Sequence, residues 1–105
     1  KPKLDRDALW RISEPALKKH FESNREQYGY YLQARGPHGM KLHRMVLLED
    51  PLQPEDDAYT MVVRFEGEGL IIGNLSTVGL TKDFRYKIRP ENETVSVLDW
   101  NLQPR

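Results

Sequence analysis

Cysteine is absent from this sequence of 105 residues, and that absence excludes several kinds of chemistry at once. A disulfide framework, a thiol nucleophile, an iron–sulfur cluster and a thiolate zinc site all require cysteine. A folded chain of about 100 residues can still reach marginal stability by burying apolar side chains alone. The sequence therefore predicts a fold that needs no cofactor.

Long hydrophobic runs are missing as well. The longest spans residues 69–73, whereas a helix that crosses a membrane needs about 18 to 20 apolar residues. We therefore expect a soluble protein with no membrane partner.

An excess of charge of one sign is also lacking, because sixteen Lys and Arg residues balance sixteen Asp and Glu residues. No overall field attracts the chain to nucleic acid or to anionic lipid, so any such affinity needs a local patch. The length and the 38% share of hydrophobic residues favour one folded core. We predict a single domain over residues 1–105.

The first quarter of the chain has the pattern of a helix. Asp5 can cap a short first run, and Ser13 can cap a second run in which Pro15 occupies the first turn. Leu17, Phe21 and Tyr28 follow at helical spacing and share one apolar stripe. We expect this stripe to cover a sheet.

The rest of the chain alternates with the period of two that is typical of strands. The segments with this pattern, or with an unbroken apolar run, are residues 28–34, 40–48, 58–65, 70–75, 84–89 and 94–100. Turn-forming sequences separate them, including residues 66–69 and an acidic loop with two prolines at residues 49–57.

No connection between these segments is long enough to hold a crossover helix, which favours antiparallel pairing of sequential strands. The predicted fold class is α+β: an N-terminal helical segment packed on an antiparallel meander sheet of five to six strands, open or curled around the helix. Nine residues in the apolar phase of their local pattern are predicted to be buried: Phe21, Leu42, Met61, Val63, Phe65, Ile72, Phe84, Ile88 and Val97.

Catalytic and metal-binding motifs are not found. The three histidines, His20, His38 and His43, lack the spacing of a metal site, and we expect all three at the surface. No serine lies in a nucleophile elbow, and no glycine-rich phosphate loop occurs. We therefore predict no catalytic residue and no metal site, and the sequence disfavours an enzyme.

The most organised charged feature is the segment from Phe84 to Arg89. Its alternation places Arg85, Lys87 and Arg89 on one strand face, and Arg64 extends this row if the neighbouring strand lies beside it. Tyr31 follows Tyr30 directly, so one of these two rings is expected to be exposed and available to a partner. The predicted partner-binding residues are Tyr31, Arg64, Arg85, Lys87 and Arg89.

Three functions fit these observations. The first is a non-enzymatic module that binds a protein partner through a sheet face or an edge strand. The alternative is binding of single-stranded nucleic acid along the basic strand at residues 84–89. The third is a small-ligand binder or enzyme whose site lies inside a curled sheet and is assembled from distant parts of the sequence.

Overall fold

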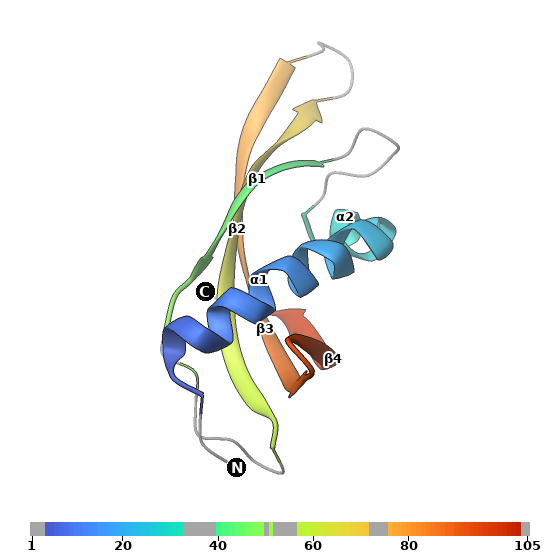
Figure 1. Cartoon of the computed structure of the whole chain (residues 1–105). Helices are drawn as coiled ribbons and strands as arrows, with labels where there is room; N and C mark the ends of the chain where they lie inside the picture. The colour runs from blue at the N-terminus through green and yellow to red at the C-terminus, as the bar shows by residue number, and fades with distance from the viewer. Residues whose placement is uncertain (1–3, 33–39, 50, 52–56, 72–75, 104–105) are drawn as a thin grey trace.

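The computed structural model of the protein describes residues 4–32, 40–49, 51, 57–71 and 76–103, without the side chains of 30–32, 40, 70, 71 and 76–78. Two helices are followed by four strands (Figure 1). In chain order they are α1 (Arg6–Ser23), α2 (Arg25–Leu32), β1 (Met40–Leu47), β2 (Tyr59–Ile71), β3 (Ser76–Glu91) and β4 (Thr94–Leu102).

The four strands form one antiparallel sheet in the order β1-β2-β3-β4, and α1 crosses one face of it (Figure 1). The predicted α+β fold, an N-terminal helix packed on an antiparallel meander, is confirmed. The predicted number of five to six strands is not confirmed, since the described residues form four.

One surplus strand came from the turn predicted at residues 66–69. In the structure β2 continues through this segment, and Gly67 and Gly69 pair with Leu80 and Val78 of β3. Glycine weakens a strand by only about 0.5 to 1 kcal/mol, so continuous pairing with β3, together with pairing to β1 that is shifted only between Leu42 and Arg44, keeps the segment extended. The start of the predicted strand at 70–75 is the end of β2, and residues 72–75 lie outside the described part of the chain.

The other surplus strand was predicted at residues 28–34, and the described part of this segment is helical instead. The backbone N–H of Tyr28 donates to the carbonyl of Asn24 over 3.1 Å, which continues helical bonding past the end of α1. The Tyr28 side chain is buried, and its ring centroid lies 5.1 Å from that of Phe21. The alternation of Tyr28, Tyr30, Leu32 and Ala34 imitated a strand, but burial of Tyr28 beside the helical stripe favours the helix.

Helix α1 is continuous, where the sequence predicted two capped runs. Its N-cap is Asp5, as predicted, and the Asp5 carboxylate accepts the N–H of Ala8 over 2.7 Å. The predicted cap at Ser13 is wrong, because the Ser13 hydroxyl donates to the carbonyl of Leu9 over 2.6 Å inside the helix. Pro15 also lies inside the helix, on its exposed side.

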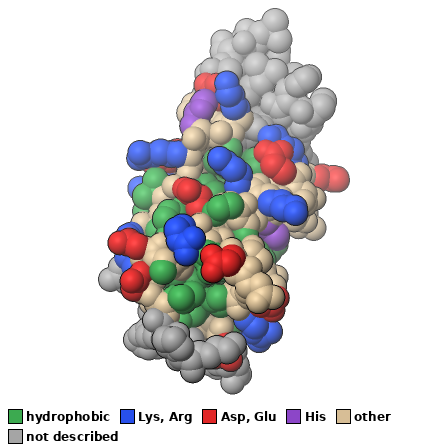
Figure 2. All heavy atoms as spheres, viewed as in Figure 1, with side chains coloured by type: hydrophobic (Ala, Val, Ile, Leu, Met, Phe, Trp, Pro, Cys, Tyr) green, Lys and Arg blue, Asp and Glu red, His purple; other side chains and the backbone are tan. Residues whose placement is uncertain are grey.

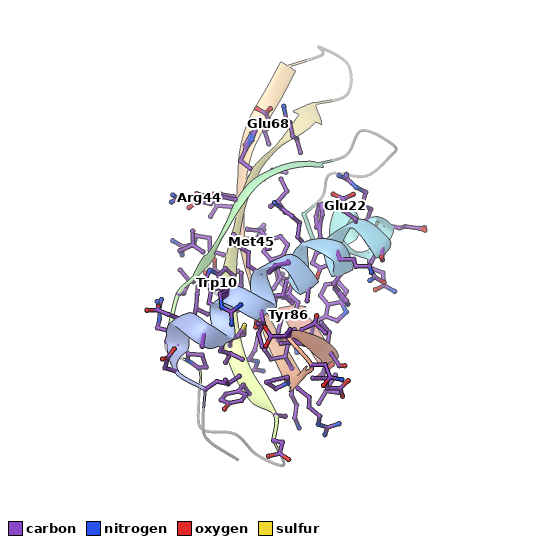
Figure 3. The ribbon with its side chains drawn as sticks, viewed as in Figure 1. Trp10, Glu22, Arg44, Met45, Glu68 and Tyr86 are labelled. Carbon is purple, nitrogen blue, oxygen red and sulfur yellow. The ribbon has the colours of Figure 1, made fainter. Side chains whose placement is uncertain are left out.

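The core lies between α1 and the sheet. Six predicted core residues are buried there: Phe21, Met61, Val63, Phe65, Phe84 and Ile88. Leu42 and Val97 are only partly buried, and Ile72 lies outside the described residues. Met45 and Tyr86 point into this layer, whereas Arg44 projects away from β1 (Figure 3).

Candidate functional site

The sheet has two faces of opposite character. We call the face that contacts the helices the inner face, and the opposite one the outer face. Strand alternation assigns Thr60, Val62, Arg64 and Glu66 of β2 and Asp83, Arg85, Lys87 and Arg89 of β3 to the outer face. No helix of the described chain covers the outer face, because the core contacts of α1 and α2 are made with the inner one.

Arg64 lies on the outer face, as predicted, but its charge is already paired. Its Nε donates to Oδ1 of Asp83 over 2.9 Å and its Nη2 donates to Oδ2 over 3.2 Å. This two-point bond raises the pKa of Arg64 and fixes the plane of the guanidinium. Asp83 is buried to 7% exposure, so the pair forms a rigid, nearly neutral unit.

Arg85, Lys87 and Arg89 continue from this unit along β3, and we call them the cationic row. Arg85 and Lys87 are exposed and Arg89 is partly buried. Among the described residues none of the three forms an ion pair. The structure thus brings together four of the five predicted partner-binding residues; the fifth, Tyr31, lies in α2 with its side chain outside the described part.

The cationic row has an apolar neighbour and acidic flanks. Val62 lies directly opposite Arg85 and is only partly buried, so an aliphatic surface adjoins the guanidinium. Asp99 of β4 lies opposite Lys87, and Asp83 precedes Arg85 by two residues on the same face. The row is therefore a short positive strip bounded by carboxylates.

Toward the other end of the outer face, acidic side chains lie next to basic ones. Arg44 Nε donates to Oε2 of Glu66 over 2.6 Å, and this bond lowers the pKa of Glu66. His43 Nε2 lies 3.5 Å from a Glu68 carboxylate oxygen. The uncompensated positive charge is consequently concentrated on β3.

The two edge strands are both interrupted by a β-bulge. In β1 the register shifts between Leu42 and Arg44, which leaves His43 as the extra residue. In β4 Asp99 and Val97 pair with consecutive residues of β3, which leaves Leu98 as the extra residue. Bulges on edge strands hinder the addition of another strand. Of the two predicted surfaces, the geometry therefore favours the sheet face over an edge.

A group that the sequence did not reveal lies on the inner face. The Tyr28 hydroxyl is 2.8 Å from Nδ1 of His20 and 2.7 Å from the Tyr86 hydroxyl, so the three side chains form a hydrogen-bonded chain. Burial raises the pKa of both tyrosines and lowers the pKa of His20. The expected surface position of His20 is wrong, because its ring also contacts Trp100 edge-on at 5.2 Å. The approach of Tyr28 to His20 depends on the break between α1 and α2 at Asn24, because residues eight positions apart in one continuous helix lie about 12 Å apart along its axis.

Aromatic rings fill the centre of the inner face. The ring centroid of Tyr28 lies 4.2 Å from that of Trp100, 5.2 Å from Phe84 and 5.5 Å from Phe65. Tyr28, Phe65, Phe84 and Tyr86 are all fully buried. The space that these rings occupy between helix and sheet is not open to a ligand.

The side of the molecule that carries α1 has no continuous patch of one kind among the described residues. Hydrophobic side chains lie there in small groups between Lys, Arg, Asp and Glu side chains (Figure 2). In the described part of the chain, no three His, Asp or Glu side chains are grouped to hold a metal ion. Neither described helix has the length and apolar character needed to cross a membrane.

Comparison of the chain with known protein families, with curated proteins and with solved structures finds no match.

Proposed function

We propose that the protein is a non-enzymatic binding module that engages an acidic segment of another protein through the outer face of its sheet. The observation that carries the proposal is the cationic row of Arg85, Lys87 and Arg89, which has no ion-pair partner among the described residues and lies beside Val62. Positive charge next to aliphatic surface matches a partner with carboxylates around an apolar side chain.

The rigid pair of Arg64 and Asp83 supports the same proposal. A guanidinium held at two points along one edge by a carboxylate loses little conformational entropy when a partner packs on it. Arg64 would therefore contribute a fixed flat surface next to the row, and the row itself would supply the attraction.

A protein partner is favoured over single-stranded nucleic acid because of the carboxylate of Asp99 beside the row. Asp99 is exposed opposite Lys87 and would repel a phosphate backbone that runs across the sheet at this point. An acidic protein segment can be shorter than a bound nucleic-acid strand. Its carboxylates can therefore lie on the cationic row without approaching the acidic side chains beside it.

Affinity capture tests the proposal. The wild-type protein is immobilised beside a triple variant, Arg85→Gln, Lys87→Gln and Arg89→Gln, and beside a control with Lys18→Gln and Lys19→Gln on the exposed side of α1. Extract from the source cells is applied to each. We expect a defined acidic protein to bind the wild type and the control and to be lost from the triple variant.

Oligonucleotide binding, measured at two salt concentrations, separates the alternative. The nucleic-acid function would replace the protein proposal if two results are found together. Oligonucleotide binding would fall steeply as the salt concentration rises, and the slope of log affinity against log salt concentration would be smaller by about three in the triple variant. Capture that is the same for the wild type and the triple variant would exclude the outer face as the binding surface.

A further inference from the structure

The hydrogen-bonded chain of His20, Tyr28 and Tyr86 joins three elements of the fold. His20 belongs to α1, Tyr28 to α2 and Tyr86 to β3. The two tyrosines are fully buried, whereas the His20 ring is half-buried at the end of the chain. Among the described residues, the Tyr86 hydroxyl has no hydrogen-bond partner other than Tyr28.

Only one direction of this chain satisfies every buried proton. The Tyr86 hydroxyl donates to Tyr28, and the Tyr28 hydroxyl donates to the lone pair on Nδ1 of His20. This arrangement requires a neutral imidazole with its proton on Nε2. No hydroxyl proton is then left without an acceptor.

Protonation of His20 removes the acceptor at the end of this chain. Nδ1 then carries a proton and donates to the Tyr28 oxygen, so the two hydroxyl protons have only each other's oxygens as acceptors among the described residues. Whichever tyrosine donates to the other, one hydroxyl proton is left without an acceptor in a fully buried position. An unsatisfied buried donor is costly, so the protonated state disfavours the docked position of Tyr28.

The groups around His20 offer no compensating charge. Tyr28 faces it from α2, Tyr86 from β3 and the Trp100 indole from β4. The nearest charges on those elements are directed elsewhere: Arg25 pairs with Glu22 over the Phe21 ring, and Asp99, Arg85 and Lys87 belong to the outer face. Burial, with no charged group of the described chain contributing, lowers the pKa of His20.

Among the described side chains of α2, Tyr28 is the one that packs into the core. Of the described α2 side chains, Arg25, Glu26 and Gln27 are exposed, and Tyr28 is buried. We infer that His20 is a pH-sensitive switch: with a neutral imidazole α2 is docked through Tyr28, and protonation at acidic pH loosens α2 from the sheet.

The sign of the pH dependence follows from the lowered pKa. The unfolded chain takes up a proton at His20 near pH 6.5, while the folded chain does so only at lower pH. Stability from this group is therefore complete above pH 6.5 and is lost as the pH falls toward the folded pKa.

Hydrogen exchange tests the inference, with protection factors corrected for intrinsic exchange and compared at about pH 7.5 and about pH 5. We expect protection in α2 to fall by about tenfold or more at the lower pH, relative to β3. In the variant His20→Gln, whose side-chain oxygen accepts the Tyr28 hydroxyl at both pH values, α2 should keep its protection. An equal fall in both proteins, or no fall in the wild type, would overturn the inference.

A second measurement uses the wild type alone and so does not depend on the variant's folding. The ring nitrogen shifts of His20 should report the tautomer with the proton on Nε2 and a pKa below 6.5, the ordinary value for histidine. A proton on Nδ1 of the neutral ring, or a pKa at or above 6.5, would contradict the proposed direction of the chain.

Discussion

The two faces of one strand, β2, show how differently this sheet uses its side chains. Val63 points to the inner face and is fully buried among aromatic rings, while its neighbour Val62 points to the outer face and is only partly buried beside Arg85. Side chains of the inner face contribute mainly by packing in the core, whereas side chains of the outer face are mainly charged and accessible to a partner. A substitution should therefore change stability on one face and binding on the other.

The largest effect is expected for Phe65→Ala. Phe65 is fully buried, and its ring contacts those of Phe21, Tyr28 and Phe84. Truncation should lower the free energy of unfolding by about 3 to 5 kcal/mol, because the surrounding rings cannot fill the cavity. Chemical denaturation measures this loss, and a value below about 1 kcal/mol would mean that Phe65 is not central to the core.

A sharper comparison uses the two adjacent valines, which differ only in the face they occupy. Val63→Ala should cost about 2 kcal/mol, because two methyl groups leave a fully packed site. Val62→Ala, the matched control, should cost less than about 1 kcal/mol, because much of its side chain already contacts solvent. Equal losses in denaturation experiments would remove the distinction between the faces.

Tyr86→Phe tests the polar part of the inner face. The substitution removes one hydroxyl and keeps the ring, and the Tyr28 hydroxyl can still donate to His20. We expect a loss of about 0.5 to 1.5 kcal/mol, the usual net contribution of one hydrogen bond. Thermal or chemical unfolding that shows a loss of several kcal/mol would indicate that Tyr86 makes a further buried interaction.

The smallest effect on stability is expected for the combined variant Arg85→Gln, Lys87→Gln and Arg89→Gln. Exposed charges without close partners usually change stability by about 0.5 kcal/mol or less each. Its melting temperature should remain close to that of the wild type while binding is lost. Substantial unfolding in calorimetry would place these side chains in structural ion pairs.

Much of the fold could be predicted because the period-two alternation at residues 58–65, 84–89 and 94–100 matches real strands. The errors in the predicted elements arose where the local sequence pattern predicts one structure and the tertiary contacts favour another. Glycines at positions 67 and 69 are typical of a turn, yet pairing with β1 and β3 keeps them in β2. Tyr28, Tyr30, Leu32 and Ala34 alternate like the residues of a strand, yet tertiary burial of Tyr28 favours a helix.

The candidate site was predictable only in part. Alternation was enough to place Arg85, Lys87 and Arg89 on one face of their strand, since strand geometry determines side-chain direction, whereas the position of Arg64 on the same face also required β2 to pair with β3. The pairing of Arg64 with Asp83 depends on the register between β2 and β3, and the contact of His20 with Tyr28 depends on how α2 docks. Neither is encoded in a local pattern.

Thiol labelling tests the difference between the two faces most directly, because the chain contains no cysteine and each introduced thiol is the only one present. The variants Arg85→Cys on the outer face and Val63→Cys on the inner face are treated with a thiol reagent under native conditions. We predict rapid labelling at position 85, close to the rate of an unstructured thiol, and labelling at position 63 slower by at least about a thousandfold, limited by opening of the core. Similar rates at the two positions, or faster labelling at position 63, would contradict the assignment of a closed inner face and an open outer face.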